Sequence, residues 1–165
     1  MNCRIYNYLF LSYNQMPYLF IKENNMLRTL FIITIFFSTP VFASTFSIDM
    51  LNVRQDGQSM VYSQDVLKVE PGDTVTWKPK DKGHNVEFII GPDTVELPKK
   101  SRINQEFTYT FEQPGVYFYQ CTPHKSMGMI AVVIVGSDLS NLDAVKQVRV
   151  FGKSKRKLEE ILSLI

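Results

Sequence analysis

The chain has 165 residues, with 18 Lys and Arg against 16 Asp and Glu and a formal net charge of +2 at pH 7. Over residues 44–165 the two signs balance at 15 each, so net charge identifies no class of partner and gives no support to nucleic-acid binding. Those 122 residues suffice for one domain with its own core, and they do not imply a second one.

The N-terminal segment has the features of a secretory signal rather than of a folded domain. Residues 26–43 combine Arg28, an apolar run over residues 30–37 and a small-residue ending at Ala43, which together indicate cleavage before Ser44. The apolar run is shorter than the roughly 20 residues of a spanning helix, so an uncleaved membrane anchor is the less favoured alternative. We expect export to the periplasm and no stable membrane insertion of the mature chain.

Residues 1–25 lie upstream of that signal, and Met26 offers a second start. We interpret residues 1–25 as an extension added by a start site that was placed too early. Removal of this extension takes Cys3 away and leaves Cys121 as the one cysteine of the mature chain. An unpaired thiol in an oxidising compartment needs burial or a bound metal.

The mature chain begins with short alternating or apolar runs separated by turns that contain Gly and Pro. Short strands at such intervals predict a mainly β fold, a Greek-key β-sandwich over residues 44–136. In such a sandwich, loops from different strands meet at one end. The predicted strands cover residues 46–52, 66–69, 74–77, 86–90, 107–111, 116–120 and 130–135.

Two loops of this sandwich hold the residues that indicate chemistry. His84 lies between two predicted strands, and Cys121, His124 and Met129 follow a third with the spacing Cys-x2-His-x4-Met. One thiolate, two imidazoles and a thioether are the ligand set of a one-electron copper site. Zinc is less favoured, because structural zinc sites take cysteine and histidine at four positions. Singly, each of these residues is more often core packing, and it is the combination that predicts a metal site.

The pattern becomes helical after Gly136. Ser140 and Asp143 have the spacing of a capping pair and predict the start of a first helix. A second segment carries apolar residues at helical spacing, so we expect two helices in residues 137–165 that pack on the sandwich. The apolar stripe consists of Leu158, Ile161, Leu162 and Ile165.

A short basic run precedes that stripe. We interpret it as a solvated face without an assigned function, because four charges without interleaved aromatic residues are weak evidence for a nucleic-acid or membrane patch. The run consists of Lys153, Lys155, Arg156 and Lys157.

On these residues the chain resembles the cupredoxins, the small type I blue copper proteins, and among them the pseudoazurins. The resemblance runs from about residue 46 to residue 165 and rests on residues 81–87 (DKGHNVE), 114–117 (PGVY) and 121–129 (CTPHKSMGM). It implies a cupredoxin-like sandwich with a helical C-terminal extension. It also implies one copper ion bound by His84, Cys121, His124 and Met129, with Asn85 tying the two ligand loops together.

Met127 leaves an alternative open for the axial ligand. Amicyanins place their axial methionine three residues after the histidine, which would here select Met127. The Met-Gly-Met ending and the helical tail match the pseudoazurin pattern. We therefore favour Met129 and expect Met127 to pack near the site.

The resemblance implies a soluble periplasmic carrier of single electrons that cycles copper between Cu(I) and Cu(II). Its partners would be redox proteins such as a copper nitrite reductase or a c-type cytochrome, which a monomer would meet in a transient contact around His124. A basic ring at that end would steer acidic partners toward an apolar patch; the alternative is ordinary surface charge, which nearby acidic residues partly offset (Asp81, Glu87, Asp93 and Glu96). The basic residues are Lys78, Lys80, Lys82, Lys99, Lys100, Arg102 and Lys125, and the apolar ones are Met60, Pro79, Pro123 and Met127.

The alternative function is copper delivery or storage, in which the protein hands over the ion rather than the electron. An enzyme is not expected. Copper enzymes that act on nitrite or oxygen need a second, more open site with further histidines, and His84 and His124 are the only histidines of the chain.

Overall fold

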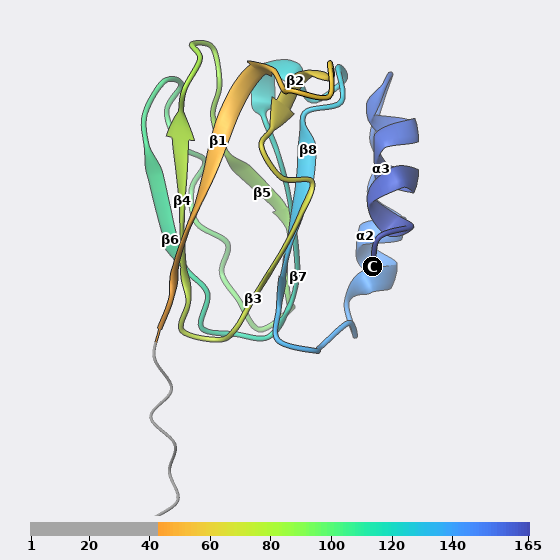
Figure 1. Cartoon of the computed structure of the whole chain (residues 1–165). Helices are drawn as coiled ribbons and strands as arrows, with labels where there is room; N and C mark the ends of the chain where they lie inside the picture. The colour runs from red at the N-terminus through yellow and green to blue at the C-terminus, as the bar shows by residue number, and fades with distance from the viewer. Residues whose placement is uncertain (1–42) are drawn as a thin grey trace, which may run out of the picture. The chain divides into compact units, whose positions relative to one another are not determined.

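The computed structural model describes residues 43–165, so the predicted extension (1–25) and nearly all of the predicted signal (26–43) lie outside the described residues. Figure 1 shows two β-sheets packed face to face, with two helices at the C-terminal end. The strands are β1 (Thr45–Val53), β2 (Ser59–Tyr62), β3 (Val66–Val69), β4 (Thr74–Pro79), β5 (Glu87–Ile90), β6 (Phe107–Thr110), β7 (Gly115–Gln120) and β8 (Ile130–Val135). The helices are the single 3-10 turn η1 (Thr122–His124), α2 (Leu142–Lys146) and α3 (Ser154–Leu162).

The strand order brings distant parts of the chain together. One sheet has the order β2-β1-β4-β6 and the other the order β3-β8-β7-β5. The chain therefore crosses between the sheets at every connection from β2 to β7. These crossings allow the loop after β4 and the loop after β7 to meet at one end of the sandwich.

Burial along the strands follows from their place between the layers. All six residues of β8 are buried. Ala131, Val133 and Val135 belong to the core between the two sheets, whereas the alternate residues of the strand belong to a second apolar cluster under the helices. A strand that is covered on both faces is apolar throughout, which accounts for the run of residues 130–135.

One tyrosine fixes the approach to β7. The hydroxyl of Tyr117 donates a hydrogen bond to the backbone carbonyl of Gln113, four residues upstream, at 2.9 Å. This contact has the form of a tyrosine corner, which holds a crossing between two sheets in one conformation.

The helices cover the outer face of the β3-β8-β7-β5 sheet (Figure 1). Val145 of α2 and Ile161 of α3 are fully buried, and Leu158 is nearly so. The predicted fold class, a mainly β sandwich with a two-helix C-terminal extension, is confirmed. None of the helices in residues 43–165 is both long enough and apolar enough to cross a membrane.

Two details of the secondary structure differ from the expectations drawn from the sequence. Strand β2 was not among the predicted strands, because its sequence, SMVY, does not alternate between polar and apolar residues; Met60 within it has a positive φ of 53°. The prediction that Ser140 and Asp143 form a capping pair is wrong, since α2 begins at Leu142 and Asn141 is its N-cap residue. The Ser140 backbone N–H instead bonds to Asp138 Oδ1 at 2.8 Å.

The solvated interpretation of the basic run is wrong for its last member. Lys157 is only 5% exposed, and its Nζ contacts Asp65 Oδ2 at 2.6 Å and Gln58 Oε1 at 2.7 Å. Both partners precede it by more than 90 residues in the sequence. A buried lysine needs such partners, which no local sequence pattern reveals.

Candidate metal centre

The loop between β7 and β8 carries three of the four predicted ligands. Cys121 directly follows β7, His124 ends the 3-10 turn η1, and Met129 directly precedes β8. Hydrogen bonds close the loop on itself: the His124 N–H donates to the carbonyl of Cys121, and the Cys121 N–H donates to the carbonyl of Met129, both at 3.0 Å. Pro123 stands in the first turn of η1, where a missing backbone donor costs nothing.

The loop between β4 and β5 brings His84 to the same place. Asn85 holds the two loops together, because its Oδ1 accepts from the Thr122 backbone N–H at 2.8 Å and its Nδ2 donates to Thr122 Oγ1 at 3.0 Å. The hydroxyl of Thr122 in turn donates to Glu87 Oε2 at 2.9 Å. Tyr62 fixes the backbone of Asn85 by a bond to its carbonyl at 2.8 Å.

Three donor atoms converge between these loops. The Nδ1 atoms of His84 and His124 are 3.2 Å apart, and Cys121 Sγ lies 3.8 Å from the first and 3.5 Å from the second. Within the described residues these three side chains form a group able to hold a metal ion. Donors at these separations can share one ion at bond lengths of about 2.0 Å to nitrogen and about 2.3 Å to sulfur.

Asn52 orients the first of these imidazoles. His84 Nε2 lies 3.0 Å from Asn52 Oδ1, and this oxygen can only accept, so Nε2 carries the proton and Nδ1 keeps its lone pair for a metal. The side chain of Asn52 was not predicted as part of the site. It ends a predicted strand and lies 32 residues from His84, and no local pattern pairs the two.

The two candidate axial methionines differ in burial. Met129 is fully buried in the same core cluster as Cys121, whereas Met127 is 43% exposed. The Met129 backbone is also tied to Cys121 through the hydrogen bond between the Cys121 N–H and the Met129 carbonyl. The structure therefore brings Met129, and not Met127, into the core cluster that contains Cys121.

Burial disfavours charge on the donors of the metal-free protein. It raises the pKa of the Cys121 thiol, although the backbone N–H groups of Asn85 and His124 oppose this rise. Burial lowers the pKa of both imidazoles, and in His84 the neighbouring His124 adds to the effect while Asp81 opposes it. Both imidazoles are therefore neutral at pH 7 and ready to bind a cation, and the thiol must release its proton.

The chemistry of this donor set fits copper. Thiolate and thioether suit Cu(I), and imidazole suits both oxidation states. His84, Cys121, His124 and Met129 thus form a set typical of type I copper sites, which transfer electrons and leave no position open for a substrate.

The predicted surface residues lie around these loops. The connection that holds Lys99, Lys100 and Arg102 is fastened to the His84 loop: the Ser101 N–H donates to the carbonyl of Val86, and the Asn104 N–H to that of His84, both at 2.9 Å. Burial raises the pKa of Glu87, but the hydrogen bonds from Gln120 and Thr122 lower it, and the positive charges of Lys100 and Lys125 lower it further, so the net shift is downward. All seven basic residues of the predicted ring are exposed, as are Pro123 and Met127, whereas Met60 and Pro79 are half-buried.

Comparisons with known proteins agree with this donor set. A family model described as copper binding proteins, plastocyanin/azurin family, matches residues 48–136. The chain is 40% identical over 130 residues to a pseudoazurin of Paracoccus pantotrophus, a match that covers 78% of this chain and 88% of the relative. It is also 40% identical over 130 residues to a putative pseudoazurin of Rhizobium leguminosarum bv. viciae, covering 78% and 84% of the two chains.

Among solved structures, the fold is similar to that of a pseudoazurin from Sinorhizobium meliloti. The TM-score is 0.68 at 44% sequence identity, and the match covers 72% of this chain and 93% of the other.

Proposed function

Because the chain belongs to the plastocyanin/azurin family of copper-binding proteins and matches its pseudoazurins over most of its length, we propose that it is a periplasmic carrier of single electrons. A bound copper ion would supply the couple between Cu(I) and Cu(II). The chain would supply the ligands, hold them at one spacing in both states and present the site to redox partners. We propose no enzymatic activity.

The ligands in this proposal are the Cys121 thiolate, the Nδ1 atoms of His84 and His124, and the Met129 thioether as the weak axial ligand. The single observation that carries the proposal is the convergence of the first three donors within 3.8 Å of one another. Their loops are cross-tied by Asn85 and Thr122. A site held in this way needs little rearrangement when the charge of its metal changes, which is what rapid electron transfer requires.

We propose that partners dock around His124. This residue is half-buried between exposed Pro123 and Lys125, and the exposed Met127 lies on the same loop. A small apolar contact with a basic surround suits a transient complex with an acidic redox protein, such as a copper nitrite reductase or a c-type cytochrome. Association would slow as salt screens these charges.

The proposed location rests on the sequence before the first strand. Val41-Phe42-Ala43 has the form of a signal-peptide cleavage site, and β1 begins at Thr45, two residues after it. We propose that residues 26–43 are removed on export and that the mature protein is a monomer.

Copper delivery or storage remains the competing function, and burial argues against it. Cys121 and Met129 are both fully buried. A protein that hands its ion to another protein needs ligands within reach of the acceptor, whereas an electron can pass without exposure of the metal.

The experiment that separates the two functions measures copper retention. The protein, loaded with one equivalent of copper, is reduced with ascorbate and reoxidised over ten or so cycles beside an excess of a Cu(I) chelator. We expect about one copper per chain to remain and the same midpoint potential throughout. Loss of copper to the chelator on reduction would support delivery, and would refute the carrier function.

A further inference from the structure

The N-terminal turn of α3 lies against the ligand loop, in the stretch between His124 and Met129. Ser154, the first residue of α3, is fully buried. Its hydroxyl donates to the carbonyl of Lys125 at 2.5 Å and accepts from the backbone N–H of Gly128 at 3.1 Å. One side chain thus bridges two backbone groups that flank the turn through Ser126 and Met127.

The backbone of the same turn adds a third contact. The Lys153 N–H donates to the carbonyl of Ser126 at 2.9 Å. Gly152 has a positive φ of 59° and no side chain, and a Cβ atom at this position would collide with the Ser126 carbonyl oxygen. The glycine therefore permits a close approach of the two segments that other residues would prevent.

Contacts within the loop carry this restraint to the ligands. The Met127 and Met129 N–H groups both donate to the carbonyl of His124, at 2.9 Å and 3.4 Å. Gly128, whose N–H is held by Ser154, directly precedes Met129 and has a positive φ of 110°. A shift at Ser154 would thus move the backbone that sets the position of the Met129 side chain.

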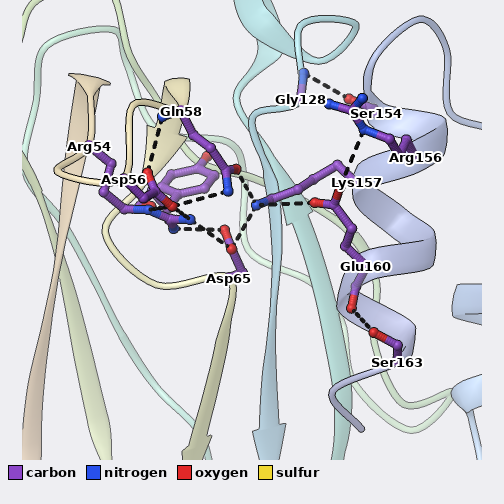
Figure 2. A network of polar contacts seen from close by, with 11 residues as sticks. Arg54, Asp56, Gln58, Asp65, Gly128, Ser154, Arg156, Lys157, Glu160 and Ser163 are labelled. Carbon is purple, nitrogen blue, oxygen red and sulfur yellow. Dashed lines mark hydrogen bonds and ion pairs between the residues drawn. The ribbon is translucent and has the colours of Figure 1, made fainter.

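The helix itself is anchored one turn further on (Figure 2). Lys157 Nζ reaches across to Asp65 and Gln58 on the sandwich, and Asp65 is also paired with Arg54 at 3.0 Å. Leu158 and Ile161 pack in the apolar cluster under α3. These contacts keep the helix from sliding, so Ser154 meets the loop from a fixed position.

We propose that Ser154 is a positioning residue for the copper site, which sets how closely Met129 approaches the metal and thereby tunes the site's reduction potential. The inference rests on the proposed copper function. The thioether is the weak ligand of a type I site, and the potential of such sites depends on the axial ligand and on hydrogen bonds around the ligands. Ser154 touches neither the metal nor a ligand side chain, and acts through the loop backbone.

The test compares Ser154→Ala with Ser163→Ala. Ser163 follows the last turn of the same helix, and within residues 43–165 its exposed hydroxyl bonds only to the carbonyl of Glu160. In the copper-loaded protein we expect Ser154→Ala to change the ratio of the two visible thiolate-to-copper bands and to shift the midpoint potential, whereas Ser163→Ala matches the wild type. If Ser154→Ala is less heat-stable but keeps the band ratio and the midpoint potential of the wild type, then Ser154 only stabilises the fold, and the inference is overturned.

Amide hydrogen exchange in the wild-type protein gives a second test that needs no variant to fold. We expect the Gly128 N–H to exchange as slowly as the Cys121 N–H, and at least about tenfold faster in Ser154→Ala if that protein folds. A Gly128 N–H that exchanges in the wild type like an exposed amide would overturn the inference. A wild-type protein without the visible bands would refute the proposed function instead, and these exchange rates would still decide whether Ser154 holds the loop.

Discussion

Both ring nitrogens of His84 have partners, and these partners hold the imidazole in the orientation that a metal ligand needs, although His84 is remote from the other ligands in the sequence. Nδ1 faces His124 and Cys121, while Nε2 faces the side-chain oxygen of Asn52. A partner at the second nitrogen fixes the tautomer and the orientation of the ring before a metal arrives.

Asn52→Ala should therefore weaken copper binding without removing a ligand. Loss of the acceptor at Nε2 frees the ring of His84 to rotate and to change tautomer, so we expect copper affinity to fall about 10- to 100-fold. The measurement is a competition titration with a Cu(I) chelator. Gln55→Ala, at an exposed position shortly after β1, serves as the control, and equal affinities for the two variants would contradict this role of Asn52.

The choice between Met129 and Met127 is testable at the same scale. Met129→Leu removes the axial donor at nearly constant volume, a change that costs less than about 1.5 kcal/mol of stability. We expect a higher reduction potential, because a lost electron-pair donor disfavours the oxidised ion, and an altered visible spectrum. Met127→Leu should change neither, and the reverse result would identify Met127 as the axial ligand.

At the scale of secondary-structure elements, Asp65 joins β3 and the loop before it to α3. Its carboxylate pairs with Arg54 at 3.0 Å and with Lys157 at 2.6 Å. Asp56 also pairs with Arg54 at 2.7 Å, and its own pKa is lowered to about 2, chiefly by that hydrogen bond. The network thus connects two elements that are remote in sequence through one half-buried acid (Figure 2).

Asp65→Ala should destabilise the fold strongly. It leaves the nearly buried Lys157 ammonium without its closest negative charge, and breaking one side of a buried pair costs about 3–5 kcal/mol. The measurement is urea denaturation of the metal-free protein. Asp143→Ala breaks an ion pair with Lys146 in which both side chains are more than half exposed, so its effect should be much smaller. Equal losses in the two variants would contradict the buried pairing.

Strand β7 makes the fold sensitive to alkaline pH. Burial, with a smaller contribution from Tyr109, raises the pKa of Tyr117 to about 12, against about 10 in an unfolded chain. The folded protein thus holds this proton more tightly. The resulting stability is fully present below pH 10 and is lost between pH 10 and 12, by about 2–3 kcal/mol in total.

Tyr117→Phe tests this assignment in the metal-free protein. The variant loses the hydrogen bond to Gln113, at a cost of about 1 kcal/mol near pH 7, but its free energy of unfolding should fall less steeply above pH 10 than that of the wild type. Urea denaturation at several pH values gives both slopes, and parallel curves would show that Tyr117 does not titrate with the raised pKa.

Across the whole molecule, features that depend on residues close together in the sequence could be predicted, whereas features that depend on contacts between distant segments mostly could not. Cys121, His124 and Met129 stand within nine residues, so their spacing alone predicted a shared loop. Alternating apolar runs and their turns likewise predicted most strands of the sandwich. The donors of His84 and Cys121 do converge, as the combination of ligand types and the expected sandwich predicted, but local spacing alone could not join two loops that are brought together by long-range strand pairing.

Apart from the short strand β2, the features that were not predicted are contacts between distant segments. Asn52, Lys157 and Ser154 act through partners between 26 and 99 residues away, and each looks like an ordinary surface residue in its own stretch of sequence. The failed helix cap has the same cause. Asn141 at the start of α2 uses its side chain to hold the backbone of Val116 in β7, at 2.9 Å and 2.8 Å, rather than to cap the helix.

We propose that this chain builds one type I copper site from His84, Cys121, His124 and Met129 and uses it to pass electrons. The visible absorption spectrum of the protein with one equivalent of Cu(II), recorded before and after a cycle of ascorbate reduction and reoxidation, tests it most directly. We predict an intense blue thiolate-to-copper band that bleaches and returns, and that is absent in Cys121→Ser. A colourless or weakly coloured complex, or a band that does not return, would show that the protein is not a type I copper electron carrier.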